Sequence, residues 1–209
     1  MLIGFDLDNT IIRYDKSLHK IALERGLIQK DVPRLKRSIR DEVRRLHGDE
    51  EWQKLQVAIY GTEIDKAELM PGVWDCLLTL KQAGHSFQIV SHKTRYPNYG
   101  QLKIDLRKCA LNFLTEANFF SSDTLSMSVN DIFFLSTREE KVRKIADLDH
   151  HYFIDDLEEV FTEPLFPDSV HKILFSREKN GRKIPGCSVF STFEEISNFI
   201  LKRTANGTI

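Results

Sequence analysis

Short apolar runs, each followed by a polar residue, recur along the chain. The first occupies residues 2–5, Leu-Ile-Gly-Phe, directly before Asp6. A near-continuous apolar run of this length is typical of a strand that is buried on both faces of a parallel sheet. Later runs of the same form predict further strands at 87–90, 132–135, 152–154 and 173–175.

Helical patterns alternate with these runs. Apolar residues with helical spacing predict a helix over 73–83, and Gly84 provides a stop signal. The same spacing predicts helices at 102–113, 142–145 and 193–200. Strands that alternate with helices indicate an α/β fold with a doubly wound parallel sheet. Ligands bind at the carboxyl ends of the strands in such sheets, so the polar residues that follow the runs are candidate site residues.

The stretch 14–70 departs from this alternation because it contains no convincing strand. Its apolar residues follow two helical faces, and glycines separate the helical segments. We therefore expect a core domain formed by 1–13 and 71–209, with an α-helical domain, 14–70, inserted after the first strand. The members of the two faces are Val32, Leu35, Ile39, Val43 and Leu46 on the first, and Trp52, Leu55 and Ile59 on the second.

Composition narrows the class of protein. The 209 residues include 30 lysines and arginines against 31 aspartates and glutamates, and the formal net charge is −1. This balance excludes a general electrostatic attraction to nucleic acid or to an anionic membrane. No apolar run is long enough to cross a bilayer and the first residues do not resemble a signal peptide, so we expect a cytoplasmic protein. The separated cysteines Cys76, Cys109 and Cys187 indicate neither a disulfide framework nor a zinc site.

Paired carboxylates follow two of the predicted strands. Asp6 and Asp8 come after the first strand, and Asp155 and Asp156 follow the strand at 152–154. Two carboxylates about 4 Å apart repel by about 1 kcal/mol in water and by about 4 kcal/mol at an effective dielectric constant of about 20. A hard divalent cation would remove this repulsion. Because all the candidate ligands are oxygen atoms, Mg²⁺ is favoured over zinc.

Four short segments occur in an order that resembles the haloacid dehalogenase-like superfamily. They are 6–10 (Asp-Leu-Asp-Asn-Thr), 89–91 (Ile-Val-Ser), Lys141 and 153–156 (Phe-Ile-Asp-Asp), and they look like the four motifs of that superfamily. The resemblance covers residues 2–156 and is to the phosphatases of the superfamily. It implies a Rossmann-like core, with the inserted helices forming a cap between the first and second motifs that closes over the carboxyl edge of the sheet.

The resemblance also implies catalytic roles. Asp6 would attack phosphorus and form an aspartyl-phosphate. Asp8 would protonate the leaving oxygen and then deprotonate the water that hydrolyses the intermediate. Ser91, with nearby backbone N–H groups, would hold a phosphoryl oxygen, and Lys141 would neutralise charge on the nucleophile and on the transferring group.

A Mg²⁺ site follows from the same resemblance. The cation would lie between the side chains of Asp6 and Asp155, the backbone carbonyl of Asp8 and a phosphate oxygen. Asp156 would orient Lys141 or a metal-bound water.

Neighbouring residues add candidates and alternatives. Lys144, one helical turn beyond Lys141, and Lys93, close after Ser91, are alternatives for the motif lysine. A solvated loop position explains the His92 side chain as well as substrate contact does, and Arg95 lies in a segment that also reads as a loop. The candidates for binding the substrate beside Ser91 are Asn9, Thr10, His92 and Arg95.

A cluster of basic residues lies in the expected cap. Between residues 30 and 45 the chain has seven basic and three acidic residues, so the local net charge is 7 − 3 = +4. A solvated helix face explains such a cluster, and so does recognition of an anionic substrate by the cap. The cluster lacks interleaved aromatic residues for base stacking, so nucleic acid is not an expected partner.

The sequence thus predicts a Mg²⁺-dependent phosphatase that hydrolyses a small phosphomonoester. A phosphotransferase or phosphomutase would use the same nucleophile, and a non-catalytic binding module would keep only the fold. A receiver-type signalling domain also combines acids, a hydroxyl and a lysine, but there the acidic pair precedes the phospho-acceptor. Here the order is reversed, because Asp6 comes first and the pair Asp155 and Asp156 comes later.

Overall fold

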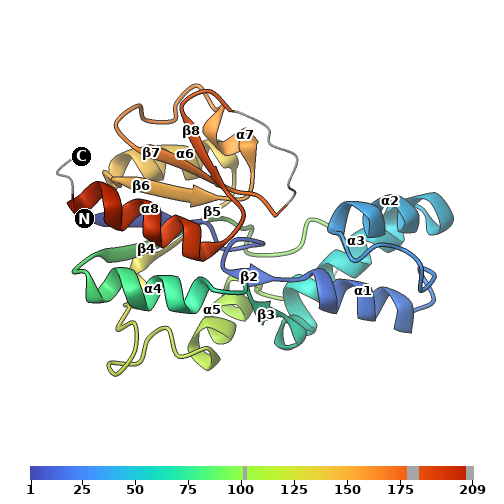
Figure 1. The fold of residues 1–209 in the computed structure, drawn as a ribbon. Coiled ribbons are helices and arrows are strands. Elements are labelled where there is room, and N and C mark those ends of the chain that lie inside the picture. Colours follow the sequence, from blue (N-terminus) through green and yellow to red (C-terminus); the bar gives the residue numbers. More distant parts are fainter. Residues whose placement is uncertain (101–102, 178–183, 206–209) are drawn as a thin grey trace.

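A six-stranded parallel sheet forms the core of the protein (Figure 1). The computed structural model describes residues 1–100, 103–177 and 184–205. The strands lie in the order β5-β4-β1-β6-β7-β8, and the neighbouring pairs are parallel. Their bounds are β1 Leu2–Phe5, β4 Ser86–His92, β5 Ile132–Leu135, β6 Tyr152–Asp155, β7 His171–Phe175 and β8 Cys187–Phe190.

Helices cover both faces of this sheet. Three of them, α4, α5 and α8, form one apolar cluster with alternate strand residues such as Ile3, Phe5 and Ile89. The other two, α6 and α7, pack on the opposite face with Val90 and Phe153. The predicted doubly wound α/β sheet is therefore confirmed. The helix bounds are α4 Val73–Gln82, α5 Leu106–Glu116, α6 Arg138–Asp147, α7 Glu158–Phe161 and α8 Phe193–Ala205, and a short 3₁₀ turn, η3 Val129–Asp131, precedes β5.

Gly4 allows β1 and β6 to lie side by side. Gly4 is paired with Phe153 in the sheet, and the Phe153 ring occupies the space where a side chain at Gly4 would lie. A Cβ there would lie only 2.5 Å from Phe153 Cδ2 and 3.0 Å from His150 Cδ2. Glycine inside a strand often marks such a close approach. The pairing that it permits sets the residues after β1 beside the end of β6.

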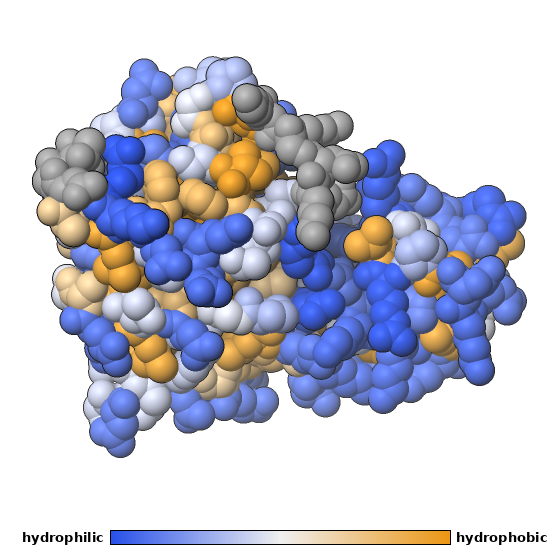
Figure 2. Space-filling view, viewed as in Figure 1, coloured by the Kyte–Doolittle hydropathy of each residue, from blue (hydrophilic) through white to orange (hydrophobic). Residues whose placement is uncertain are grey.

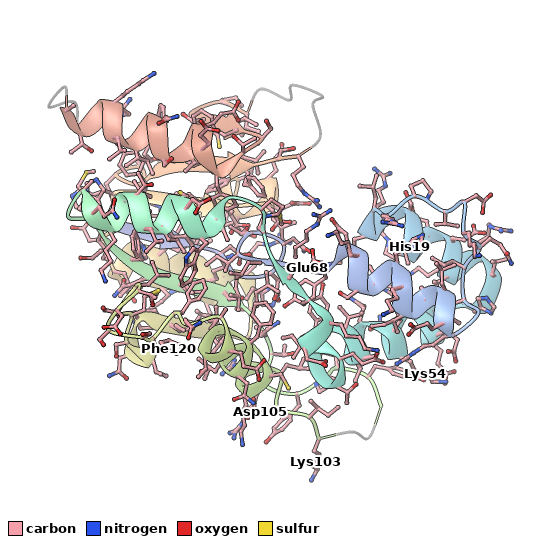
Figure 3. The ribbon with its side chains drawn as sticks, turned by 60° about the horizontal axis from the view of Figure 1, so that its bottom comes forward. His19, Lys54, Glu68, Lys103, Asp105 and Phe120 are labelled. Atoms are coloured by element: carbon pink, nitrogen blue, oxygen red, sulfur yellow. The ribbon has the colours of Figure 1, made fainter. Side chains whose placement is uncertain are left out.

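Residues 14–70 form a group of helices beside the core, which we call the cap segment (Figure 1). The strands β2 Ile12–Arg13 and β3 Glu68–Leu69 pair antiparallel where the chain leaves and re-enters the core. Figure 3 labels Glu68 at this junction, with His19 and Lys54 on the cap segment beyond it. The elements of the cap segment are α1 Asp15–Glu24, α2 Lys36–His47, α3 Asp49–Val57, the π-helical turn η1 Ala58–Thr62 and the 3₁₀ turn η2 Ile64–Lys66.

Three strands were not predicted from the sequence pattern: the two-residue strands β2 and β3, and the edge strand β8. The expectation that 14–70 contains no strand is wrong, because β3 consists of Glu68 and Leu69. A strand of two residues is too short to produce a recognisable periodicity. The third, β8, lies at one edge of the sheet, and its residues are half-buried or exposed. It therefore lacks the uninterrupted apolar run that marks the inner strands.

The helix predicted at 102–113 begins later than its apolar spacing indicates. Asp105 caps α5 by accepting hydrogen bonds from the backbone N–H groups of Arg107 and Lys108. This carboxylate satisfies two of the N–H groups that the first turn of a helix leaves free. The helix consequently begins after Asp105, and Leu102 lies outside the described residues.

In α2 the buried stripe is narrower than the predicted apolar face. Ile39 and Val43 are fully buried, whereas Leu35 and Leu46 are 47% and 45% exposed. The helix begins at Lys36, so Leu35 precedes it and does not continue its apolar face.

No helix in the part of the chain that the structure describes is long and apolar enough to cross a membrane.

Candidate active site

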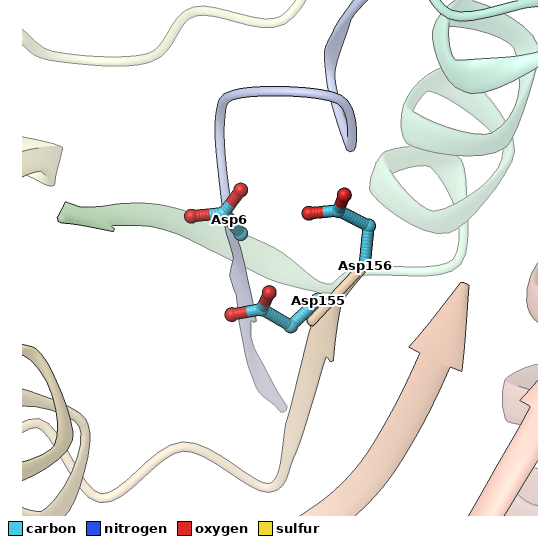
Figure 4. A group of neighbouring side chains, drawn as sticks. All are labelled: Asp6, Asp155 and Asp156. Carbon is cyan, nitrogen blue, oxygen red and sulfur yellow. The ribbon is translucent and has the colours of Figure 1, made fainter. Parts of the chain in front are cut away.

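Three carboxylates meet at the carboxyl edge of the sheet (Figure 4). Asp6 directly follows β1, Asp155 is the last residue of β6, and Asp156 comes next. The two strands are neighbours, and the backbone N–H of Asp6 donates to the carbonyl oxygen of Ile154 at 2.8 Å. This register brings one oxygen of each carboxylate within 4.8 Å of the others. The acidic pairs after the two strands therefore converge.

Lys141 lies between two of these carboxylates. Its Nζ donates to Asp6 Oδ1 at 2.5 Å and to Asp155 Oδ2 at 2.6 Å, and the residue is 1% exposed. The Thr137 side chain caps α6 by accepting a hydrogen bond from the Glu140 N–H, which starts the helix just before Lys141. Burial disfavours the ammonium form, but attraction to Asp155 and Asp6 outweighs it and raises the pKa of Lys141.

One ammonium does not balance the three carboxylates. Burial raises the pKa of Asp6 to about 7, against the opposing effect of Lys141. Burial, together with Asp6 and Asp155, also raises the pKa of Asp156 well above its ordinary value. Asp156 Oδ1 is buried and has no hydrogen-bond partner among the described residues. The oxygen donors, the surplus negative charge and this unpartnered oxygen all fit a hard divalent cation.

Two donors hold Asp8 from opposite oxygens. The Tyr14 hydroxyl donates to Asp8 Oδ1 at 2.7 Å, and Lys93 Nζ donates to Asp8 Oδ2 at 2.7 Å. Burial and the adjacent Asp8 carboxylate raise the pKa of Tyr14 well above its ordinary value, so the hydroxyl remains a donor. Each oxygen of Asp8 retains a further lone pair for a substrate or a water molecule.

The turn after Asp8 is formed by Asn9 and Thr10. Asn9 has a φ of 65°, in the left-handed region that asparagine tolerates better than most residues. Its backbone N–H donates to the Ile12 carbonyl oxygen at 2.8 Å, which turns the chain back into β2. Thr10 is fully buried, and its hydroxyl has no hydrogen-bond partner within the described parts of the chain. The structure thus places both residues in the loop that carries Asp8.

Ser91 lies near the end of β4, the strand that pairs with β1 on the side away from β6. The residue is 1% exposed, and its Oγ has no hydrogen-bond partner among the residues described. A buried hydroxyl without a partner costs free energy, and a ligand oxygen that accepts its proton removes that cost. Ser91 is therefore suited to hold an oxygen of a bound anion.

Three of the candidate side chains have partners away from the acidic cluster. His92 is exposed, and its Nε2 lies 3.1 Å from the carbonyl oxygen of Ser136. The Arg95 guanidinium donates to Asp105 Oδ2 at 2.8 Å, and 63% of its side chain is exposed; Figure 3 labels Asp105 beside α5. Lys144 lies over an aromatic ring of β5, with its Nζ 4.5 Å from the ring centroid. Lys141, and not Lys144, contacts the carboxylates.

Tyr60 of the cap segment was not identified from the sequence. It contacts both residues that hold Asp8, Tyr14 and Lys93. Its ring packs edge-on against Tyr14, with the centroids 4.7 Å apart. Lys93 Nζ lies 4.9 Å and Lys36 Nζ 5.5 Å from the Tyr60 centroid. The residue belongs to η1, a π-helical turn, and such turns occur frequently at functional sites. A cavity of about 140 Å³ opens beside Tyr60.

Of the three residues around Asp8, Lys93, Tyr14 and Tyr60, only Lys93 has a position that the local sequence pattern relates to the site. Ser91 and Lys93 are two positions apart, and residues with this spacing on a strand share a face. Lys93 also continues the pairing beyond β4, because its N–H donates to the Leu135 carbonyl oxygen at 2.9 Å. By contrast, the spacing of Tyr14 and Tyr60 from the motifs gives no indication of contact, since the cap segment must fold before they meet.

The fold of the chain is that of haloacid dehalogenase-like hydrolases of known structure. No protein-family profile matches the chain, and no curated protein is similar to it in sequence. Solved structures are similar along most of the chain. A haloacid dehalogenase-superfamily hydrolase from Entamoeba histolytica is 14% identical over 93% of this chain and 94% of its own, with a TM-score of 0.55. The structural similarity shows a shared fold, and at this low sequence identity it shows the fold alone.

Two further similar structures have descriptions that bear on chemistry. A protein from Clostridium acetobutylicum described as a predicted phosphatase is 16% identical over 96% of this chain and 98% of its own, with a TM-score of 0.56. A haloacid dehalogenase-family hydrolase from Deinococcus radiodurans, solved with bound phosphate and sodium, is 13% identical over 97% of this chain and 96% of its own, with a TM-score of 0.53.

Proposed function

We propose that the protein is a Mg²⁺-dependent phosphatase that hydrolyses a small phosphomonoester. The observation that carries this proposal is the environment of Asp6, which lies 2.5 Å from Lys141 Nζ and beside Asp155 and Asp156. A carboxylate attacks a phosphate dianion only where positive charge offsets their repulsion, and the ammonium and a cation-binding acidic cluster can supply it. The phosphatase description and the bound phosphate of the similar structures support the same chemistry.

The proposed reaction has two displacements at phosphorus. One Asp6 oxygen attacks phosphorus, and the bond from phosphorus to the alcohol oxygen breaks. Protonated Asp8 donates its proton to that oxygen, and the alcohol leaves. The Asp8 carboxylate then takes a proton from a water molecule whose oxygen attacks the aspartyl-phosphate. The bond between phosphorus and Asp6 breaks, inorganic phosphate leaves, and Asp8 is again protonated. Tyr14 and Lys93 position Asp8 for both proton transfers.

The remaining residues bind and stabilise the phosphoryl group. The unpartnered Ser91 hydroxyl donates to a phosphoryl oxygen, and Lys141 offsets charge on Asp6 and on the group in transfer. Asp6, Asp155 and Asp156 would hold the cation, together with the backbone carbonyl of Asp8. When bound, Mg²⁺ supplies charge neutralisation for the carboxylates and polarises a phosphate oxygen.

A cytosolic location is part of the proposal. The three cysteines are free, as is usual for a protein of a reducing compartment.

A phosphotransferase or phosphomutase would share Asp6 and differ only in the acceptor of the phosphoryl group. Release of inorganic phosphate in step with the alcohol distinguishes hydrolysis from transfer.

The test is turnover of a generic aryl phosphate with and without Mg²⁺. We expect wild type to release inorganic phosphate, chelation to abolish the activity, and added Mg²⁺ to restore it. Asp6→Asn removes the nucleophile and should lower kcat by about 10⁴-fold or more. Asp147→Asn, a change of the same type at an exposed position on α6, is the matched control. Equal rates for wild type and Asp6→Asn would refute the assignment of the nucleophile.

A further inference from the structure

Lys36 differs from the other basic residues of the cap segment. Several of those residues pair with an acid nearby on the same surface: the half-buried Arg40 with Asp41, and the exposed Arg44 and Arg45 with Asp49 and Glu42. Lys36 is half-buried, and its Nζ lies over the Tyr60 ring. No carboxylate of the described residues lies within ion-pair distance of its Nζ. The cap segment thus directs one ammonium toward the core without pairing it.

A short chain of contacts links Lys36 to the residue that handles the proton of the leaving group. Lys36 and Lys93 both lie over the Tyr60 ring, at 5.5 and 4.9 Å from its centroid. Lys93 donates to Asp8 at 2.7 Å, and Tyr14 packs against Tyr60 while donating to the other Asp8 oxygen. Electrostatic attraction to Asp8 and Asp156 also reaches Lys36. Lys36 therefore lies on the side of the site where Asp8 meets the substrate.

The position of Asp8 decides which part of the substrate Lys36 meets. Under the proposed function Asp8 delivers its proton to the alcohol oxygen, so the groups around Asp8 surround the alcohol portion of the substrate and not the phosphoryl group. Lys93 is already engaged by Asp8. Lys36 has three N–H donors, and the Tyr60 hydroxyl accounts for one of them. The free donors are available to an acceptor on the substrate.

We propose that Lys36 recognises an anionic substituent, a carboxylate or a second phosphate, on the alcohol portion of the substrate. This inference rests on the proposed function, because it takes Asp8 as the marker of the leaving group. Withdrawing an ammonium from water has a cost that contact with an aromatic face offsets only in part. A substrate anion that fills the open hydrogen-bonding positions would offset the rest. The substrate class is thus a small phosphomonoester with a second negative group.

The experiment compares matched substrates. Carboxyalkyl phosphates of graded length are each paired with the hydroxyalkyl phosphate of equal length, and kcat/KM is measured for wild type and for Lys36→Met. Wild type should prefer the carboxylate member of at least one pair by about tenfold or more, the effect of one hydrogen bond to a charged group. Lys36→Met should bring this ratio close to one. Lys36→Arg should retain the preference, and Lys36→Glu should shift it toward aminoalkyl phosphates.

Lys30→Met is the matched control, since Lys30 is an exposed lysine of the same basic cluster. It should keep the wild-type ratio. A ratio that Lys36→Met and Lys30→Met leave equally unchanged would overturn the inference while the proposed function stands. If wild type hydrolyses no phosphomonoester, the proposed function fails instead. Calorimetric binding of the same pairs to Asp6→Asn and to Asp6→Asn with Lys36→Met then decides the role of Lys36.

Discussion

The two charged regions of the molecule are built in opposite ways. At the sheet edge, Asp6, Asp155 and Lys141 are buried, and their charges face one another across distances of 2.5 and 2.6 Å. On the cap segment most charged side chains lie in water, and Figure 2 shows hydrophilic residues over this part of the surface. Arg37 is typical, with 85% of its side chain exposed beside Asp41.

The difference in burial separates the charged residues of the candidate site from the charged residues that keep the surface of the cap segment hydrated. A buried ion costs free energy unless it is paired, and an incomplete set of partners makes that cost larger. Exposed pairs contribute little, because water and salt screen them. The buried acidic cluster therefore lowers the stability of the protein when no cation is bound, which is consistent with the proposed cation site. Apart from Lys36, most of the basic residues that give residues 30–45 a net charge of +4 lie on the solvated surface of the cap segment.

The largest effect on stability should come from Lys141→Met. It leaves the carboxylates of Asp6 and Asp155 buried without their shared ammonium, and we expect the free energy of unfolding to fall by about 3–5 kcal/mol. Lys144→Met makes the same change one turn along α6, where the ammonium lies over an aromatic ring instead. Denaturant unfolding with a chelator present measures both. Equal losses for the two variants would show that the acidic cluster does not depend on Lys141.

Cation binding should produce the next largest effect. Mg²⁺ at about one hundred times its Kd should stabilise the wild type by about 2.7 kcal/mol, because it binds only the folded acidic cluster. Asp156→Asn should weaken binding by about 10–100-fold. At the same Mg²⁺ concentration its stabilisation then falls to about 0.4–1.4 kcal/mol. Without the cation this variant should be at least as stable as wild type, since it removes a buried negative charge that lies beside Asp6 and Asp155.

The measurement for this prediction is thermal unfolding with and without Mg²⁺, with Asp147→Asn as the surface control. A wild-type unfolding temperature that does not respond to Mg²⁺ at any concentration would remove the cation site from the proposal. An identical response of wild type and Asp156→Asn would instead exclude Asp156 alone from that site.

The smallest effect is expected on the cap surface. Arg45→Gln removes the exposed ion pair with Glu42, in which the two side chains are 2.6 Å apart at their nearest atoms. We expect the unfolding temperature and the turnover to equal those of wild type at both low and high salt. Thermal unfolding and turnover, each measured at the two salt concentrations, test this prediction. A loss of more than about 2 °C would show that the surface pairs stabilise the fold and would weaken the contrast between the two regions.

Much of the fold and of the acidic cluster was predictable from the chain. The apolar runs identify five of the six strands of the parallel sheet. The four inner strands must be apolar on both faces, and the edge strand β5, Ile132–Leu135, is apolar throughout. The edge strand β8 escapes this reasoning, since its half-exposed residues are under no such requirement. Asp6 and Asp155 follow inner strands, and a parallel sheet places such residues at one edge.

Local pattern places Lys93 on the same face as Ser91, but it does not indicate which acid Lys93 or Lys141 contacts. Lys93 and Asp8 are 85 positions apart, and Lys141 and Asp6 are 135 positions apart. Periodicity states which face of an element a residue occupies, but not which distant side chain it meets. Arg95 shows the limit most clearly, because its place after the second motif suggests substrate contact while its guanidinium pairs with Asp105.

By itself the sequence determined a doubly wound sheet, an inserted helical segment and the acidic residues that follow the strands, because strand burial and helical periodicity are local requirements. Only the tertiary structure decided that Lys141, and not Lys144, pairs with both Asp6 and Asp155. It also decided that Tyr14 and Lys93 donate to Asp8, and that Lys36 alone among the described cations of its cluster lies over Tyr60. The physical reason is that charges interact through space over a few ångströms, and the packing of separate elements sets those distances.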